Sequence, residues 1–249
     1  MTVLVLHDLG GDSSQLASML PQLPDVWAPD LPAHGMNAVP ADAEALSVYR
    51  LAQQVAQGMP QHASGAPLTV IGLGLGAAVG LRIALSGVFR MDRFVAIRPS
   101  FTHQTLPEHL TIYPVLADLL GTTTYGTGID QVMAKLVTTG IYNDIRSASR
   151  AAATEVERQI TAPGARDRRM RLADIPMHPA FEAHEFDTLD LPSMVIADPT
   201  DPVHPLSVAA QWSDLLGAAQ RVTPDRGRDP HGADAWIRHQ LDEYLVGVR

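Results

Sequence analysis

The sequence predicts an α/β fold with a mostly parallel central sheet flanked by helices. Two patterns indicate this: short apolar runs alternate with stretches of helical periodicity, and turns rich in glycine, proline and aspartate follow several of the apolar runs. The length agrees, because a chain of 249 residues with 46% hydrophobic side chains can bury a sizeable core. We therefore expect one domain that carries an insertion.

The expected strands are six apolar runs, at residues 2–7, 25–31, 68–73, 93–100, 193–199 and 220–224. The expected helices lie between them, at about residues 13–21, 43–59, 75–87, 206–217 and 232–246. From about residue 101 to residue 190 the patterns are helical and no convincing strand occurs. An insertion of this size most economically forms a cap over the strand ends. We expect a core of residues 1–100 and 191–249 and a helical cap of residues 101–190.

The charge and composition limit the partners. A formal net charge of −9 and a pI near 5.5 argue against nucleic acid or an anionic membrane, which need a basic surface, and favour a small neutral or cationic ligand. The absence of cysteine excludes disulfides, thiolate catalysis and cysteine-type zinc sites. No histidines have metal-ligand spacing, so neither a metal nor a cofactor is expected. With no signal peptide and no apolar run near the roughly 18 residues of a membrane span, we expect a cytoplasmic protein. The sequence does not indicate its oligomeric state.

Three turns follow expected strand ends, which is where ligands bind in open α/β sheets. They read HDLGG at 7–11, GLGLG at 72–76 and DPTDPVHP at 198–205, and His231 follows later in RDPHGADAW. With APDLPAHG at 28–35, this order resembles the α/β-hydrolase family, which has an oxyanion turn, a D-L-x-G-H-G segment, a G-x-S-x-G nucleophile elbow, an acid and a final histidine. The resemblance implies that Asp201 is the triad acid and that His231 is the triad histidine.

The nucleophile elbow departs from the family pattern at its central position, which is Gly74. Glycine has no side chain to attack a carbonyl, so covalent catalysis from this position is impossible. The flanking glycines Gly72 and Gly76 are retained, and they would let the backbone turn sharply. We therefore expect the turn to persist without its nucleophile.

A second departure lies in the oxyanion turn, where Asp8 stands at a position that is commonly glycine in the family. The backbone N–H groups of Leu9 and Leu75 are the expected oxyanion hole, but a carboxylate beside them would oppose a developing negative charge. The two altered turns also resemble NDRG-type proteins, a branch of this fold generally regarded as non-catalytic. His7, in the same turn, is expected to support the floor of the pocket.

The expected site residues also have structural interpretations. Asp201 is suited to capping a turn before the next helix, and His231 to lying on the surface near a helix N-cap. His34 is expected, like His7, to support the floor of the pocket. Five other histidines are expected to be solvated or to lie in the cap: His103, His109, His178, His184 and His204. The run RDRRMR at 166–171 is expected to form an exposed face of the insertion.

The leading hypothesis is an atypical enzyme acting on a small organic substrate without an acyl-enzyme, by lyase, epimerase, cyclase or direct water-attack chemistry. In it, His231 is the general base, Asp201 orients it, and the amides of Leu9 and Leu75 polarise a carbonyl. One alternative is a non-catalytic pseudo-hydrolase that binds a ligand or a protein. Another is a hydrolase whose serine was engineered away or whose nucleophile was relocated to Ser100 or Thr102. A dinucleotide site is disfavoured, because the strand after the glycine turn ends in Arg98, Pro99 and Ser100 with no acidic residue for a ribose.

Overall fold

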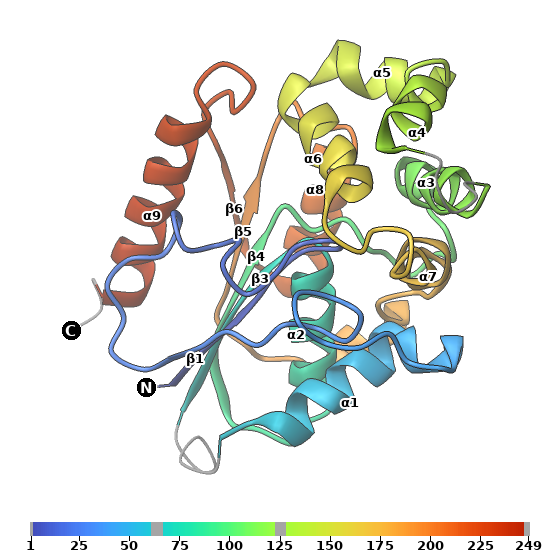
Figure 1. Cartoon of the computed structure of the whole chain (residues 1–249). Helices are drawn as coiled ribbons and strands as arrows, with labels where there is room; N and C mark the ends of the chain where they lie inside the picture. Colours follow the sequence, from blue (N-terminus) through green and yellow to red (C-terminus); the bar gives the residue numbers. More distant parts are fainter. Residues whose placement is uncertain (1, 61–66, 123–127, 247–249) are drawn as a thin grey trace.

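The computed structural model describes residues 2–60, 67–122 and 128–246, and its centre is a six-stranded sheet (Figure 1). Every neighbouring pair of strands is parallel, and the strand order is β2-β1-β3-β4-β5-β6. The strands are β1 (Thr2–Leu6), β2 (Val26–Trp27), β3 (Leu68–Leu73), β4 (Met91–Ile97), β5 (Ser193–Ala197) and β6 (Ala219–Val222). The expected parallel sheet is confirmed.

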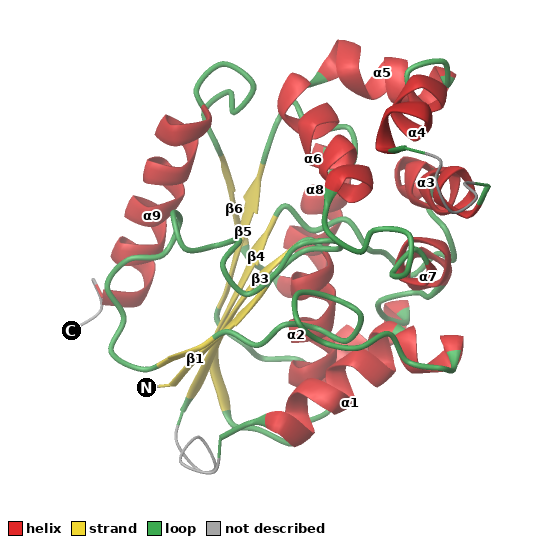
Figure 2. Cartoon of the chain, in the orientation of Figure 1, coloured by secondary structure: helices red, strands yellow, loops and turns green. Residues whose placement is uncertain are grey.

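Helices cover both faces of the sheet (Figure 2). One face carries α1 (Val48–Gly58), α2 (Leu75–Leu85) and α8 (Leu206–Leu216), and the other carries α9 (Pro230–Val246). Side chains alternate along each strand, so Leu4 and Leu6 pack on the α2 side while Val3 and Val5 pack toward α9. Burial on both faces explains why β1, β3 and β5 read as continuous apolar runs.

A group of helices lies between β4 and β5 in the sequence. Its members are α3 (Ile112–Gly121), α4 (Ile129–Leu136), α5 (Gly140–Ala148), α6 (Arg150–Thr161) and α7 (Met170–Asp174). In Figure 1 they stand together on the α2 side of the sheet, and their buried side chains join the same apolar core as that face. Short 3-10 turns complete the described chain: η1 (Ala43–Leu46), η3 (Glu108–Leu110), η4 (Ile175–Met177) and η5 (Ala183–Thr188).

Two expected elements differ from the structure. Residues 13–19 form consecutive turns instead of a regular helix: the N–H groups of Gln15, Ala17 and Met19 donate to carbonyls three residues back, at 2.9–3.0 Å. Turns closed in this way seldom extend into a long helix. The strand expected at 25–31 shortens to Val26–Trp27, since Pro29 has no N–H for a strand ladder. Among the described residues, no helix combines the length and apolarity needed to cross a membrane.

Candidate functional site

Gly74 forms the sharp turn between β3 and α2. Its φ of +51° and ψ of −110° lie in a region that side chains disfavour. The Gly74 N–H donates to the Ile97 carbonyl at 3.0 Å, and its own carbonyl accepts the Ala77 N–H at 3.1 Å. A Cβ on Gly76 would lie 2.2 Å from the Leu6 carbonyl oxygen, so the helix could not approach β1 with a larger residue there. The elbow geometry is therefore present.

The carboxylate of Asp8 occupies the space next to Gly74. A Cβ built on Gly74 would lie 1.9 Å from Asp8 Oδ1, far inside van der Waals contact. The same oxygen accepts the Leu75 N–H at 2.8 Å, at the first turn of α2. A helix N-terminus stabilises an anion through its free N–H groups and its dipole. The Leu75 amide, expected to polarise a substrate carbonyl, is thus bound to the protein's own carboxylate.

His204 bridges Asp8 to Asp201. Its Nε2–H donates to Asp8 Oδ2 at 2.9 Å, and its Nδ1–H donates to Asp201 Oδ2 at 2.9 Å. The Asp201 Oδ1 atom accepts the backbone N–H of Val203 at 2.9 Å and that of His204 at 3.2 Å, which fixes the turn after β5. The side chains of Asp8, Asp201 and His204 are all buried. A ring that donates from both nitrogens is an imidazolium.

The pKa directions agree with this arrangement. Burial alone would lower the pKa of His204, but the charges of Asp201 and Asp8 outweigh burial and raise it to about 10. Burial alone would raise the pKa of Asp201, but His204 and Arg98 outweigh burial and hold it well below its usual range. His204 is therefore charged at neutral pH and cannot accept a proton as a general base.

Arg98 extends the network to the helical group. It follows β4, and its Nη1–H donates to Asp201 Oδ2 at 2.9 Å and to Glu155 Oε2 at 3.2 Å. Glu155 lies on α6 and also accepts from Arg226, in the loop between β6 and α9, at 2.5 Å. Burial opposes ionisation of Glu155, but Arg98 and Arg226 outweigh it and lower its pKa to about 2. Three carboxylates thus meet three cations at the carboxyl ends of the strands.

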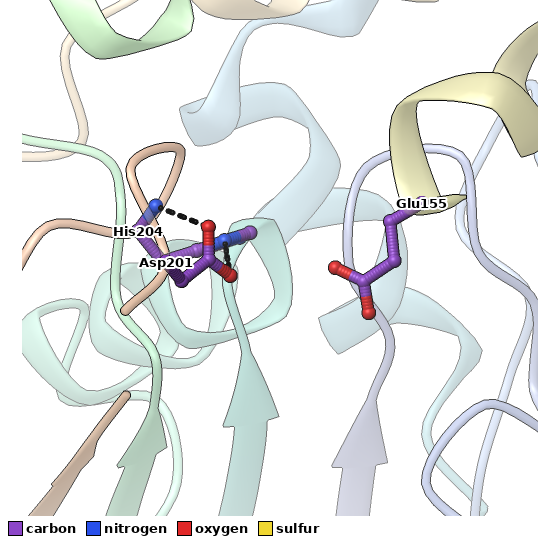
Figure 3. Close-up of side chains that lie close together, drawn as sticks. All are labelled: Glu155, Asp201 and His204. Carbon is purple, nitrogen blue, oxygen red and sulfur yellow. Dashed lines mark hydrogen bonds and ion pairs between the residues drawn. The ribbon is translucent and has the colours of Figure 1, made fainter. Parts of the chain in front are cut away.

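Glu155, Asp201 and His204 form the one described cluster whose ligand atoms lie close enough, within 4.8 Å of one another, to surround a metal ion (Figure 3). Their chemistry does not fit a metal. An imidazole ligand needs a free nitrogen lone pair, whereas both His204 nitrogens donate to carboxylates. The Arg98 guanidinium also joins Glu155 to Asp201 where a cation would bind. These three side chains are therefore suited to an ion-pair network and not to metal binding.

A cavity of about 370 Å³ lies over this network. Its wall comes from the turn after β1, from α6, from Tyr113 on α3 and from the turn after β5. The deep part of the wall includes Asp8, Tyr113 and His204, which are at most 5% exposed, while Asp12 and Arg158 are exposed at its mouth. This volume lies within the range of small-molecule sites. The cavity is the candidate functional site.

The chain aligns with solved structures over nearly its whole length. MenH from S. aureus aligns with a TM-score of 0.72 at 15% identity, over 99% of this chain and 94% of that one. An enol-lactonase from Burkholderia xenovorans aligns with a TM-score of 0.70 at 17% identity, over 98% and 91%. An esterase from Thermogutta terrifontis aligns with a TM-score of 0.69 at 16% identity, over 98% and 90%.

This chain has the α/β-hydrolase fold. The expected fold is confirmed by these alignments and by the parallel sheet. No protein-family model and no curated protein sequence matches the chain. At identities of 15–17%, these alignments establish the common fold.

Within the α/β-hydrolase fold, the expected His231–Asp201 pair does not form in the described structure. His231 is an exposed residue of the first turn of α9, where Asp229 caps the helix by accepting the Gly232 N–H at 2.9 Å. Asp201 is 4% exposed and is paired with His204 and Arg98. His204, expected to be solvated or to lie in the cap, is buried instead, because two carboxylates stabilise its charge.

The other expected pocket residues are divided between the cavity and the core. Leu9 and Asp8 line the cavity. His7 lies beneath them, where its Nδ1–H donates to the Asp8 carbonyl at 2.8 Å and its Nε2 accepts the Leu31 N–H at 2.9 Å. Ser100 is buried at 1% exposure, and its carbonyl oxygen lies 2.6 Å from His109 Nε2. The structure therefore does not bring Ser100 to the exposed His231.

Four members of the site were not predicted from the sequence: His204, Arg98, Glu155 and Arg226. A signal existed for the first two, since Arg98 directly follows a buried strand and His204 stands three residues after Asp201 in a turn at another strand end. Nothing in the sequence distinguishes Glu155 from the other polar residues of α6. Arg226 is one of several charged residues in a polar loop.

Proposed function

We propose that this chain is a non-hydrolytic protein of the α/β-hydrolase fold that binds a small molecule without forming an acyl-enzyme. One observation carries the proposal. The Asp8 carboxylate fills the space beside Gly74 and accepts the Leu75 N–H, so that a protein carboxylate lies where a nucleophile and an oxyanion would meet.

Three components of acyl transfer are absent or occupied. Gly74 supplies no nucleophile, and the Leu75 amide is bound to Asp8. His204 holds a proton on both nitrogens, so it cannot take one from a hydroxyl or from water. A buried, charge-paired network of this kind is rigid and gives up its proton reluctantly. The site keeps a pocket of substrate size but lacks the groups that acyl-enzyme chemistry requires.

A second candidate is proton-transfer catalysis without a covalent intermediate, as in the leading sequence hypothesis. The observation that favours it is that Asp8 and Tyr113 line the same cavity beside His204. In this version Asp8 is the base and the His204 imidazolium stabilises the developing charge, while the exposed His231 has no part. Recovery of a bound ligand unchanged supports the binding function, and conversion of the ligand supports this candidate.

The proposal is tested with a fluorophosphonate probe, which labels activated serine and threonine hydroxyls, and with p-nitrophenyl acetate. We expect neither labelling nor turnover of the wild-type chain. Gly74→Ser should also remain unlabelled, because Asp8 and its partners block the new hydroxyl. The double variant Asp8→Gly with Gly74→Ser removes that block. If only the double variant is labelled, Asp8 is the group that prevents a serine at the elbow from reacting. Labelling or ester turnover by the wild-type chain would overturn the proposal.

A further inference from the structure

The hydrogen-bonding groups deep in the cavity are unequally used. Three of the donors are engaged within the protein: both N–H groups of His204 and the Leu75 amide donate to carboxylates. The acceptors retain capacity, since each Asp8 oxygen accepts one side-chain or helix N–H and a carboxylate has about four acceptor positions in all. From this imbalance, together with the Tyr113 hydroxyl described below, we infer that the cavity binds an organic ammonium ion. This inference rests on the proposed binding function.

Tyr113 provides the independent observation. Only 5% of its surface is exposed, and it lines the cavity. Its hydroxyl forms no hydrogen bond within the described residues. Burial and the charges of Asp8 and Glu155 raise the pKa of Tyr113 well above its usual value, so the phenol stays neutral. This hydroxyl oxygen is not among the fully enclosed polar atoms without a partner, so it is open to the cavity. It can accept an ammonium N–H there.

Charge and shape favour the same class of ligand. Asp8 and Glu155 present carboxylates to the cavity, while Arg98 and Arg226 bind Glu155 without contributing to the cavity wall that is described. An organic anion deep in the cavity would face these carboxylates, since the Arg158 guanidinium lies exposed at the mouth. The wall also contains apolar side chains that suit a hydrocarbon group, namely Leu9, Ala152, Val156 and Val203. The aromatic ring of Tyr113 adds a surface that attracts cations.

The test uses three molecules of matched shape at neutral pH: benzylammonium, benzyl alcohol and benzoate. Saturation-transfer NMR and calorimetry with the full chain should detect binding of benzylammonium, and at least tenfold weaker or no binding of the other two. Tyr113→Phe removes the hydroxyl acceptor alone and should weaken benzylammonium about tenfold, as expected for a hydrogen bond to a charged group. The matched control is Tyr49→Phe on α1, whose exposed ring faces Arg82 outside this cavity, and it should bind like the wild type.

Equal binding of benzoate or benzyl alcohol, no binding of benzylammonium at millimolar concentration, or an unchanged affinity in Tyr113→Phe would each overturn the inference. These outcomes are distinct from failure of the proposed function. If benzylammonium binds as expected but the wild-type chain reacts with the fluorophosphonate, the non-hydrolytic function is wrong and the ligand class stands.

Discussion

At the scale of single residues, the central feature is that the elbow has no side chain and that a carboxylate from another strand end lies in its place. Gly74 leaves a space at the elbow, and Asp8, from a different strand end, fills it. His204 then lies between two carboxylates, which makes its charge a requirement of the folded state. A buried ion without its partner is far less stable than the pair.

His204→Ala tests this requirement. The substitution leaves Asp8 and Asp201 buried near each other without the cation between them, and we expect it to lower the free energy of unfolding by about 3–5 kcal/mol. The matched control is His231→Ala, which changes an exposed histidine and should alter stability by less than about 0.5 kcal/mol. Urea unfolding of both variants measures the difference. Similar losses in the two variants would contradict the assignment of His204 as the buried partner.

At the scale of elements, Glu155 connects α6 by ion pairs to two segments that are distant in the sequence. Its carboxylate binds Arg98 after β4 and Arg226 before α9, so one residue joins the helical group to two strand ends. Asp8 similarly ties the turn after β1 to the N-terminus of α2. The cavity lies between these two connections.

Glu155→Gln is expected to loosen α6, because the neutral amide leaves Arg98 and Arg226 with less compensating charge in a buried site. Hydrogen exchange of the α6 amides should become at least about tenfold faster through local opening. Glu243→Gln serves as the control, since Glu243 pairs with Arg221 at the surface with a side chain 54% exposed. In Glu243→Gln, hydrogen exchange of the α6 amides should match the wild type. Equally fast exchange in both variants would show that the Glu155 carboxylate does not hold α6 in place.

The sequence predicted the regular elements better than the contacts between them. Runs such as LTVIGL formed strands because burial on both faces selects continuous apolar residues. The helix expected at 13–21 is replaced by successive turns that are closed by bonds three residues back. The family pattern located the correct turns, including Asp8, Gly74 and Asp201. It could not reveal His204 as the partner of Asp201, because pairing depends on how separate strand ends approach one another.

At the scale of the whole molecule, the ion network makes stability depend on pH in both directions. The pKa of His204 is raised to about 10 from an ordinary value near 6.5, so its contribution is complete below pH 6.5 and is lost as pH rises toward 10. The pKa of Glu155 is lowered to about 2 from 4.5, so its contribution is present above pH 4.5 and is lost as pH falls toward 2. The depressed pKa of Asp201 acts in the same direction as that of Glu155.

These directions predict a maximum in the contribution of the network between about pH 4.5 and 6.5, given the ordinary pKa values of the two groups. Urea unfolding across the pH range should show stability declining from neutral to alkaline pH. In His204→Gln this alkaline decline should become shallower, because the variant has no imidazolium to deprotonate. An unchanged alkaline slope in His204→Gln would show that other groups cause the decline.

The protonation state of His204 is the most direct measurement of the central claim. Nitrogen-15 NMR of the imidazole ring distinguishes an imidazolium from either neutral tautomer, and the His204 signals can be assigned by their loss in His204→Gln. The network predicts that His204 remains doubly protonated at pH 8.5, because Asp8 and Asp201 raise its pKa to about 10. A neutral ring at that pH would contradict the bridging imidazolium and would make His204 available as a general base.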